Sequence, residues 1–310
     1  MPSPIERAIV CGPEWPPLKI FLLSRSRNSY ATRRFLKAAR VLGHELHVLN
    51  PLKCTLLMTT EGHELHHDGE RLEQPDLLLA RVSTSMADCG LAVIEQFEMM
   101  GVRAVNSSAA IARTLDSVRS LQLLASSGVK VVNSVMVRSP KRLREAVDLV
   151  GGPPVLLELL RGNLAVGAIL ADSLHAAEST LETLWELGQN ILLQHVLPGA
   201  EQGDIRALVI GGRVVACLRR PSLMGVFRPD PHLPANAAVE KVTPARAAVA
   251  IKAASVLDLG VAAVDMQEGP NGPVVMAVHA SPALKWFERL SGVDAARLIV
   301  EFAAGDARRP

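Results

Sequence analysis

The chain has 310 residues and a formal net charge of +2, and 49% of its residues are hydrophobic while 21% are charged. This composition excludes a disordered chain, and the small net charge offers no basic surplus for binding nucleic acid directly. The length is sufficient for two or three domains with buried cores. Any partner must therefore be inferred from local motifs.

The cysteines and the apolar segments indicate in which cellular compartment the protein is expected. The four cysteines lie far apart with no C-x-x-C pair, so they indicate neither a zinc ribbon nor a disulfide framework. Five prolines and several charged residues interrupt the leader, residues 1–18, which excludes a signal-peptide core there. No later apolar run reaches membrane-spanning length without charge. We expect a cytoplasmic protein with reduced cysteines and no membrane contact.

Strand and helix patterns alternate over the first hundred residues. Strands are expected at Lys19–Ser24, Glu45–Leu49, Leu77–Val82 and Val102–Val105, and helices at Asn28–Leu42 and Leu91–Met100. This alternation implies a parallel sheet with helices on its faces. A further helix is expected at Asp116–Ser127, where Gly128 ends it, and it should link this domain to the next.

After Val131 the pattern changes to antiparallel hairpins beside helices. The expected strand pairs are Val155–Leu160 with Ala165–Leu170, Ile205–Ile210 with Val214–Leu218, and Val261–Met266 with Val274–Val278. Glycine-containing turns separate the two strands of each pair. The second half of the chain should therefore be α+β.

Residues 63–67 read HELHH, which matches the H-E-x-x-H pattern of zinc peptidases. The pattern grips a zinc ion only on a helix, where its first and last histidines share one face. Here Gly62 precedes it, and the Asp68-Gly69 pair that follows is a strong turn signal. We therefore expect a short strand entering a turn, with solvated histidines, and not a metalloprotease.

Nine blocks occur in an order that resembles one protein family. They read LKIFLLSR from residue 18, LNPLKC from 49, IEQFEMMG from 94, NSSAAIARTLDSVRSLQLLASSG from 106, GGPPV from 151, GDIRALVIGGRVVA from 203, FRPDPH from 227, TPARAAVAIKAA from 243 and VVMAVHASPAL from 274. Together they resemble the RimK-type ATP-grasp ligases, from about Lys19 to the final helix. These enzymes join an amino acid to a carboxylate through an acyl phosphate.

The resemblance implies an α/β and α+β protein in which an N-terminal parallel α/β domain, the pre-ATP-grasp domain, precedes the ATP-grasp fold. It divides the chain into the leader at 1–18, the N-terminal domain at 19–105, the interdomain helix with the central subdomain at 106–193, and the C-terminal subdomain at 194–310. It also implies ATP between the last two parts, with Mg²⁺ or Mn²⁺.

Two family positions that carry phosphate-facing lysines are changed, to Ser117 and Glu158. A carboxylate in place of an ammonium turns attraction to phosphate into repulsion, and a unit charge pair at about 4 Å is worth roughly 4 kcal/mol at an effective dielectric near 20. The glycine-rich turn over the triphosphate reads RGNLAVG at 161–167, where Leu164 and Ala165 add bulk. The changes predict a large penalty for ATP binding.

The adenine side and the metal ligands are also changed. A Gln-Glu-aromatic pattern has become Gln194-His195-Val196. Of three metal-ligand positions, Asp265 is retained, while a glutamate has become Ala277 and an asparagine has become His279. Magnesium prefers hard oxygen ligands, and imidazole suits zinc or nickel better. We therefore expect His195 and His279 to be structural histidines, with Asp265 and His279 as the only candidates for holding a metal.

Other family positions keep their residue type. They are Asp204, Arg206, Arg219, Arg220, Arg228, Asp265, Ser281 and Pro282. The resemblance places Glu158, His195, Val196, Asp204, Arg206, Arg228 and Asp230 at cofactor-binding positions, and Arg219 and Arg228 are the candidate catalytic groups. The alternative is structural: Asp204 and Arg206 could form an ion pair, and Arg219 with Arg220 could cap a solvated strand end.

Three functions are left open. The leading hypothesis is a degenerate RimK-like protein that no longer ligates and binds a protein partner, either a related ligase or its peptide substrate, in a homo- or hetero-oligomer. The second is an active ATP-dependent carboxylate–amine ligase that adds an amino acid such as glutamate to a peptide or small acceptor. The third is a binder of another small ligand in the old nucleotide cleft.

Overall fold

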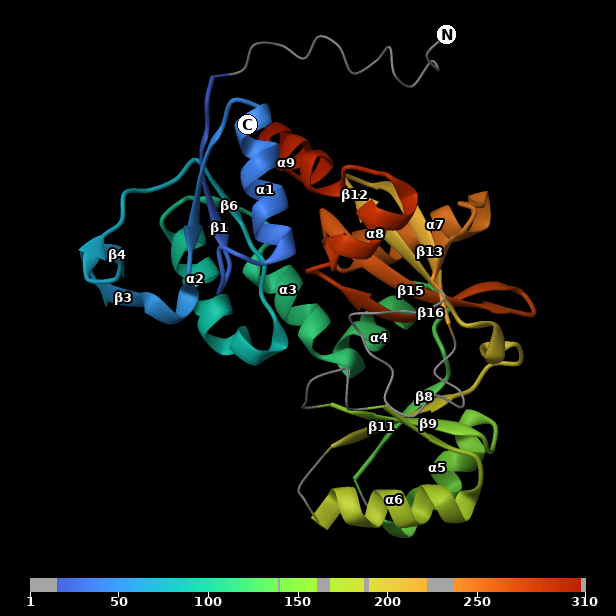
Figure 1. Ribbon diagram of the computed structural model, residues 1–310. Helices are drawn as coiled ribbons and strands as arrows, with labels where there is room; N and C mark the ends of the chain where they lie inside the picture. The colour runs from blue at the N-terminus through green and yellow to red at the C-terminus, as the bar shows by residue number, and fades with distance from the viewer. Residues whose placement is uncertain (1–15, 139, 161–167, 187–189, 222–236, 308–310) are drawn as a thin grey trace, which may run out of the picture.

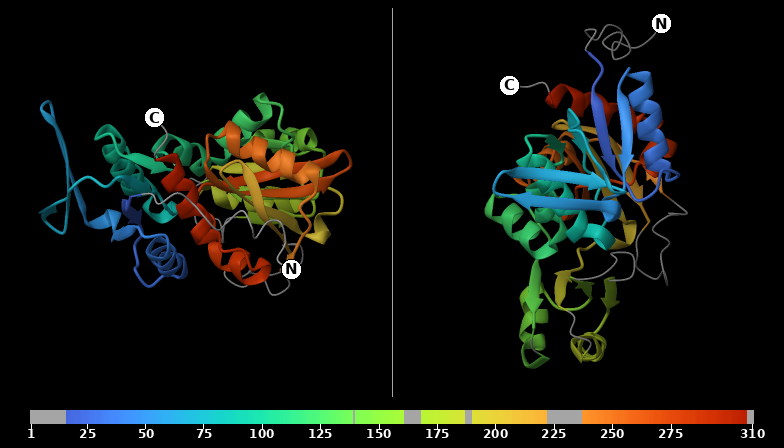
Figure 2. Two further views of the ribbon diagram at one scale, coloured as in Figure 1. Left: turned by 90° about the horizontal axis from the view of Figure 1, so that it is seen from above. Right: turned by 90° about the vertical axis from the view of Figure 1, so that its left-hand side faces the viewer.

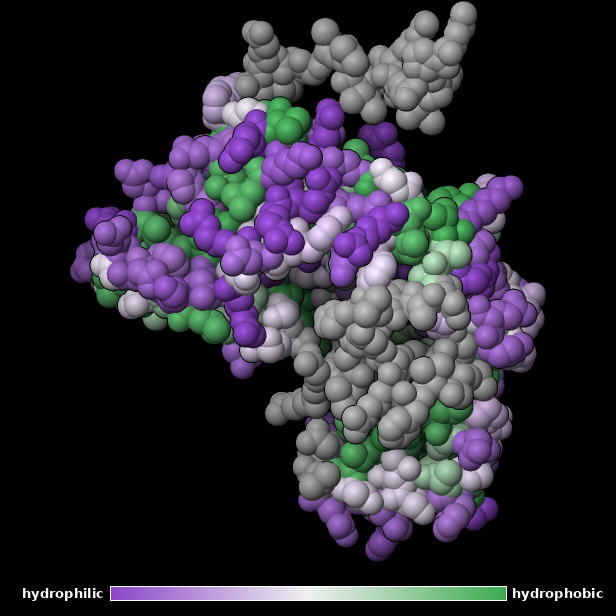
Figure 3. Space-filling view, viewed as in Figure 1, coloured by the Kyte–Doolittle hydropathy of each residue, from purple (hydrophilic) through white to green (hydrophobic). Residues whose placement is uncertain are grey.

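The computed structural model describes residues 16–138, 140–160, 168–186, 190–221 and 237–307. Within this part the chain forms an N-terminal domain, a central subdomain and a C-terminal subdomain, and the central subdomain stands apart from the other two (Figure 1). Hydrophilic residues cover most of the face of the N-terminal domain shown in Figure 3. Among the described helices, none has the length and apolar character needed to cross a bilayer.

The N-terminal domain is built on a four-stranded parallel sheet in the order β2-β1-β6-β7. Its elements are β1 (Lys19–Leu23), α1 (Tyr30–Val41), β2 (Glu45–Leu49), β6 (Leu77–Leu79), α2 (Ala87–Met99) and β7 (Arg103–Val105). The predicted parallel sheet is confirmed, although β6 ends three residues earlier than expected. Helix α1 begins after Ser29, whose side chain accepts a hydrogen bond from the Thr32 backbone N–H.

A second, three-stranded antiparallel sheet projects from this domain (Figures 1 and 2). It contains β3 (Cys54–Thr59), β4 (Gly62–His67) and β5 (Glu70–Arg71), and short 3-10 turns lie at Pro51–Lys53 and Thr84–Met86. The HELHH residues belong to β4, and Asp68 and Gly69 follow with positive φ values of 51° and 87°. The predicted strand entering a turn is confirmed, whereas β3 and β5 were not predicted.

Two consecutive helices, α3 (Ser108–Leu115) and α4 (Ser117–Ser126), lead out of the N-terminal domain. The predicted helix corresponds to α4, and its N-cap Asp116 accepts a hydrogen bond from the Arg119 backbone N–H. Helix α3 was not predicted. Just before it, the buried Asn106 side chain donates to the carbonyls of Val261 and Ala280 at 2.8 and 2.9 Å. Asn106 thus fastens the N-terminal domain to the C-terminal subdomain.

The central subdomain is a four-stranded antiparallel sheet in the order β10-β9-β11-β8 with two helices. Its elements are β8 (Ser134–Val137), α5 (Leu143–Val150), β9 (Val155–Leu159), β10 (Ala168–Ala171), α6 (Leu174–Glu186) and β11 (Ile191–His195), with a 3-10 turn at Pro140–Arg142. The predicted antiparallel pairing of β9 with β10 is confirmed. The turn between them, residues 161–167, lies outside the described residues.

The C-terminal subdomain contains a five-stranded antiparallel sheet in the order β14-β13-β12-β15-β16. Its elements are β12 (Asp204–Ile210), β13 (Arg213–Arg220), β14 (Ala238–Val239), α7 (Pro244–Val256), β15 (Val261–Gly269), β16 (Gly272–His279), α8 (Leu284–Ser291) and α9 (Ala295–Asp306), with a 3-10 turn at Ala200–Gln202. The two hairpins predicted here, β12 with β13 and β15 with β16, are confirmed. They bring residues distant in sequence into one sheet.

Hydrophobic packing groups the three parts unequally. Two clusters of buried apolar residues each combine the N-terminal domain with the C-terminal subdomain; Phe35 of α1, for example, belongs to the same cluster as Phe287 of α8. A third cluster, which includes Leu157 and Leu181, is confined to the central subdomain. The N-terminal domain and the C-terminal subdomain therefore form one packed body, and the central subdomain has a core of its own.

Candidate functional site

Asp265 of β15 is the centre of a charged cluster on one face of the C-terminal sheet. Arg206 of β12 donates from Nε and Nη2 to its two carboxylate oxygens, each at 2.6 Å. Arg220 Nη2 donates at 2.9 Å, and His279 Nε2 lies 3.2 Å away. Burial alone would raise the pKa of the Asp265 carboxyl, but the two arginine charges outweigh it and hold that pKa well below its usual range. Asp265 is therefore a fixed anion.

Strand register explains which groups pair. Arg206 lies opposite Asp265 across β12 and β15, and Asp204 lies opposite Arg220 across β12 and β13. Arg220 Nη2 accordingly reaches Asp204 at 3.1 Å as well as Asp265. The Asp204–Arg206 pair of the structural alternative is not among the ion pairs of the described residues, because each side chain has a partner on a neighbouring strand. Gln267 Nε2 donates to the second oxygen of Asp204 at 2.8 Å.

The cluster contains polar atoms whose hydrogen-bonding capacity is unused. Arg220 Nε and Gln267 Oε1 are buried and have no hydrogen-bond partner among the described residues. A buried donor without an acceptor is costly, so each of these atoms requires a partner from outside the described residues. Arg220 Nε is a charged donor, which suits an anionic oxygen.

Arg219 lies on the opposite face of the same sheet. Its neighbour across β12 is Ile205, and its Nε donates to Glu240 at 2.6 Å. Glu240 also pairs with Arg246, which in turn reaches Glu268 at 2.6 Å. The structure therefore places Arg219 in a separate ion-pair network and away from Asp265, because successive strand residues point to opposite faces.

Ser117 and Glu158 meet where the interdomain helix faces the central sheet. Ser117 Oγ, in the first turn of α4, donates to Glu158 Oε1 on β9 at 2.9 Å. Burial raises the pKa of the Glu158 carboxyl above its usual range, although the Ser117 hydrogen bond and the charge of His279 oppose this. Glu158 is thus within electrostatic range of His279, which belongs to the Asp265 cluster. The Ser117–Glu158 hydrogen bond therefore joins the interdomain helix α4 to the central sheet.

The other predicted site residues fall in several places. His195 ends β11, with its ring against Gly151 and its Nδ1 buried without a hydrogen-bond partner among the described residues. Val196 follows it, half-buried. Ala277 lies opposite Asp265 on β16. Arg228 and Asp230, like Leu164 and Ala165 of the glycine-rich turn, lie outside the described residues.

The described residues do not fit a resident divalent metal. Both oxygens of Asp265 are engaged by guanidinium groups, and Ala277 brings no ligand atom. Across the described ranges, no three His, Cys, Asp or Glu side chains are grouped to hold an ion. Both carboxylate oxygens of Asp265 serve here as acceptors in ion pairs.

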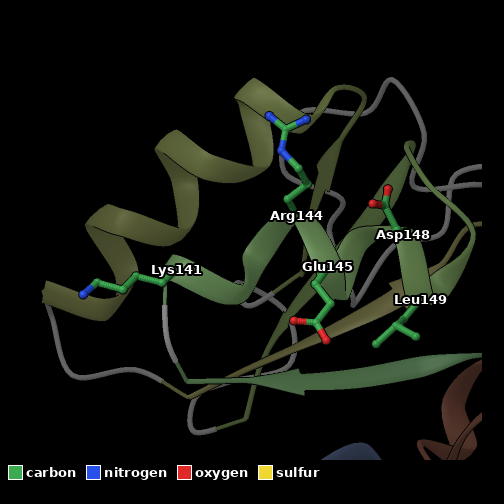
Figure 4. A pocket seen from close by; sticks show the side chains of 5 residues that line it. All are labelled: Lys141, Arg144, Glu145, Asp148 and Leu149. Atoms are coloured by element: carbon green, nitrogen blue, oxygen red, sulfur yellow. The ribbon is translucent and has the colours of Figure 1, made fainter.

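A surface hollow on the central subdomain is separate from this cluster. It is lined by Lys141, Arg144, Glu145, Asp148 and Leu149, from α5 and the 3-10 turn before it (Figure 4). Charges of both signs line it, and none of the residues predicted for the site contributes to it. The Asp265 cluster is therefore the candidate site.

The sequence did not single out Gln267, which belongs to the charged cluster, or Arg81, which lies beyond the end of β6. Gln267, two positions after Asp265, binds Asp204, and its period-two spacing on the strand could have identified it. Arg81 follows the buried strand β6 and donates from Nη2 to the Pro282 carbonyl at 2.9 Å. Its signal was a charged residue two positions after three buried leucines, at the carboxyl edge of a parallel sheet.

Comparison with known proteins finds one family over nearly the whole chain. The RimK PreATP-grasp domain matches residues 18–111, and the RimK-like ATP-grasp domain matches residues 114–303. A probable alpha-L-glutamate ligase of Thioalkalivibrio sulfidiphilus is 42% identical over 94% of this chain and 97% of the relative. One from Alcanivorax borkumensis is 38% identical over 94% and 96%, respectively.

Solved structures show the same fold at lower identity. A RimK domain ATP-grasp protein from Sphaerobacter thermophilus has a TM-score of 0.68 at 22% identity, and the match covers 92% of this chain and 99% of that one. D-cycloserine synthetase DcsG has a TM-score of 0.72 at 17% identity, covering 93% of this chain and 100% of that one. At these identities the likeness concerns the fold.

The predicted family and fold are confirmed, and the leading functional hypothesis, a degenerate binding partner, is wrong. It is contradicted by relatives about 40% identical over more than nine-tenths of the chain that carry the name of a ligase. Replacement of residues at several family positions was therefore not sufficient ground to infer loss of the ligase activity. On this evidence, the chain belongs to the RimK-type ATP-grasp family.

Proposed function

We propose that the protein is an ATP-dependent carboxylate–amine ligase that adds an amino acid such as glutamate to a peptide or small acceptor. An acceptor carboxylate oxygen bonds to the γ-phosphorus of ATP, and the bond from that phosphorus to ADP breaks. The amine of the incoming amino acid then bonds to the acyl carbon, phosphate leaves, and the amine loses a proton. The ligase names of the 38–42% identical relatives support this reaction class.

The single structural observation that carries the proposal is the unused Nε of Arg220. This atom is buried without an acceptor among the described residues, while the same guanidinium is held by Asp265 and Asp204. A fixed, charged donor aimed at an oxygen that becomes more negative lowers the barrier without reorganising during the reaction. Arg206 is held bidentately beside it. Because Asp265 and Asp204 offset the charge of the two guanidiniums, the cluster offers directed N–H donors and not a net positive charge.

The charge on Glu158 affects how well the site can bind the triphosphate of ATP. Its carboxylate would repel phosphate, but burial favours its neutral form by raising its pKa. A protonated Glu158 could donate a hydrogen bond to a phosphate oxygen instead of repelling it. The site therefore binds nucleotide best when Glu158 carries its proton.

The test is release of ADP from ATP by the purified full chain, supplied with Mg²⁺, an amino acid panel and acidic acceptors. We expect ADP release to require both substrates, and mass spectrometry to show an acceptor extended by one amino-acid residue. Arg220→Ala should lower the rate by about 10²–10³-fold, the usual effect of losing a donor to a developing anion. Arg213→Ala, an exposed residue at the other end of β13, is the matched control. No acceptor-dependent ADP release with any amino acid would overturn the proposal.

A further inference from the structure

Two free cysteines, Cys54 and Cys89, donate to the carbonyl groups of two adjacent residues where β3 begins. Cys54, the first residue of β3, donates from Sγ to the Asn50 carbonyl at 3.5 Å, and Cys89 donates from Sγ to the Pro51 carbonyl at 3.0 Å. The backbone N–H of Cys54 also donates to the Pro51 oxygen. Two donors that share one acceptor lie within about 6 Å of each other, so the Cys89 sulfur lies this close to the Cys54 backbone nitrogen.

Helix α2 holds Cys89 in this place. Cys89 lies in the first turn of α2, and Gln96 lies about two turns further on the same face of the helix. The buried Gln96 side chain donates from Nε2 to the carbonyl of Leu57 on β3 at 2.9 Å and to that of Glu64 on β4 at 3.1 Å. The face of α2 that carries Cys89 is therefore fastened to the strand that begins with Cys54.

A histidine faces Cys54 across the projecting sheet. His67 on β4 lies directly opposite Cys54, so their side chains share one face of the sheet, with Cβ atoms about 4.5–5.5 Å apart. The Nδ1 atom of His67 lies 3.8 Å from an Asp68 carboxylate oxygen, and its Nε2 atom is buried without a hydrogen-bond partner among the described residues. A neutral imidazole has one nitrogen that accepts a proton. His67 thus offers a proton acceptor beside the Cys54 thiol.

The surroundings of Cys54 determine which thiol reacts first with an external reagent. Burial raises the pKa of the Cys54 thiol to about 12, and the negative charges of Cys89 and Asp68 add to this effect. The Cys54 thiolate is therefore scarce, whereas Cys89 is partly exposed in the first turn of α2, so a reagent in solution meets Cys89 first. The contribution of Cys89 also means that the two sulfurs are within electrostatic range of each other.

We propose that Cys54 and Cys89 form a dithiol site that a small disulfide, such as oxidised glutathione, converts into a Cys54–Cys89 bridge. The Cys89 sulfur bonds to one sulfur of the reagent, and the other sulfur leaves as a thiolate. The Cys54 sulfur then bonds to the Cys89 sulfur, its proton passes to His67, and the second glutathione thiolate leaves. The two cysteines are oxidised, the reagent is reduced to two thiols, and the two protons that the cysteines lose end on these thiols.

The bridge closes a loop that contains most of the projecting sheet and one strand of the parallel sheet. This loop runs from Cys54 through β4, β5 and β6 to Cys89 in α2. A cross-link between these residues restricts the unfolded chain, so a bridge that fits the native geometry raises the melting temperature. The inference goes beyond the proposed ligase function and does not depend on it.

Oxidation of the purified full chain with oxidised glutathione at pH 8 tests the site. The remaining thiols are alkylated in urea and the chain is digested with trypsin, which cleaves after Arg71 and Arg81 and so leaves the two cysteines on different peptides unless they are bridged. Mass spectrometry then measures the linked peptide. Cys54→Ser and Cys89→Ser each remove one thiol, and Cys11→Ser is the control for loss of a cysteine outside the pair. Thermal melts establish that each variant is folded.

We expect the linked peptide to be the main oxidised product of folded wild type and of Cys11→Ser. It should be about tenfold less abundant when oxidation is carried out in urea, where the fold no longer holds the two sulfurs together. Oxidation of Cys54→Ser should stop at a glutathione adduct on Cys89, and Cys89→Ser should give no adduct on Cys54. A Cys89 adduct that persists in wild type without the linked peptide, or equal linkage with and without urea, would overturn the site.

Two further measurements test the proton transfer and the fit of the bridge. His67→Gln should slow the conversion of the Cys89 adduct into the bridge about tenfold, and His66→Gln, the preceding residue on the opposite face of β4, should match wild type. Equal rates in His67→Gln and wild type would overturn the role of His67. Bridged wild type should melt several degrees above the reduced protein, and dithiothreitol should reverse the shift. A bridged protein that melts at or below the reduced one would contradict a bridge that fits the native geometry.

Discussion

Ser117 and Glu158 are joined by a 2.9 Å hydrogen bond that crosses from the interdomain helix to the central sheet. Both stand where the family resemblance implies a phosphate-facing lysine. A hydroxyl donor and a carboxylate have therefore taken the place of two cations. The two groups form a hydrogen bond with each other. The protonation of the Glu158 carboxyl can be followed through the pH dependence of stability and of nucleotide binding.

Replacing Glu158 by glutamine should change how stability depends on pH. The folded-state pKa of Glu158 is raised above 4.5, so between these two values the folded chain binds more protons than the unfolded one. Wild-type stability should thus fall as pH rises through that window, and the loss should persist above it. Glu158→Gln should abolish this component and be the more stable protein at pH 8. Urea unfolding of both proteins at pH 4.5 and pH 8 measures the difference, and a difference that shrinks towards pH 8 would contradict the sign.

The same substitution should improve nucleotide binding. Glutamine cannot carry the negative charge that repels phosphate, so the KM for ATP should fall by several-fold in Glu158→Gln at pH 8 and approach wild type at lower pH. Glu186→Gln, which changes a residue at the end of α6, serves as the control for the loss of one carboxylate. An ATP KM that rises in Glu158→Gln would show that the carboxylate helps binding.

Neutralising Asp265 should destabilise the fold. Arg206 and Arg220 would be left without their shared partner inside the cluster, and breaking a buried ion pair costs about 3–5 kcal/mol. Asp265→Asn should show this loss in denaturant titration at pH 7. The exposed Asp148→Asn should stay within about 0.5 kcal/mol of wild type. Because the pKa of Asp265 is held well below its usual range, its contribution should disappear only in strong acid, as pH falls through the folded-state value.

Arg219 should matter for stability and not for chemistry. Its guanidinium is bound to Glu240 on the face of the sheet opposite Asp265, and its side chain is 30% exposed. Arg219→Ala should therefore cost on the order of 1 kcal/mol and leave ADP release within about twofold of wild type. A drop in ADP release as large as that of Arg220→Ala would show that Arg219 reaches the substrates.

Two cysteines should resist alkylation in the folded protein. Burial raises the pKa of the Cys54 thiol to about 12 and that of Cys217 to about 11, so their reactive thiolates are scarce at pH 8. Iodoacetamide followed by peptide mass spectrometry should find both labelled at least tenfold more slowly in buffer than in urea. Equal rates in the two solvents would mean that these thiols are accessible in the native state.

The strands that sequence predicted well are those buried on both faces or alternating strictly. β2 was expected at the residues where it occurs, and the β12–β13 and β15–β16 hairpins were marked by glycine turns. β3 was missed because its apolar run faces solvent in part: Leu57 and Met58 are 45% and 66% exposed. Apolar residues on an exposed projecting sheet give no clear periodicity, since no core selects one face.

The sequence predicted which residues form the candidate site better than it predicted which of them form ion pairs with one another. Family positions located Asp265, Arg206 and His279, which do meet. The partner of each arginine depends on cross-strand register between segments 16 to 59 residues apart, which single-sequence patterns do not fix. The separation of Arg219 from Arg220, in contrast, follows from the two-residue period of a strand and was available from the sequence.

The contacts of Asn106 affect what happens when a protease cleaves the chain. It is 4% exposed, and it accepts a hydrogen bond from the Val261 N–H at 2.9 Å in addition to the two that it donates. The segments before and after the central subdomain share two hydrophobic cores, so the central subdomain is an insertion into a single body. A protease nick within the insertion would therefore leave two fragments that copurify and separate only when the body itself unfolds.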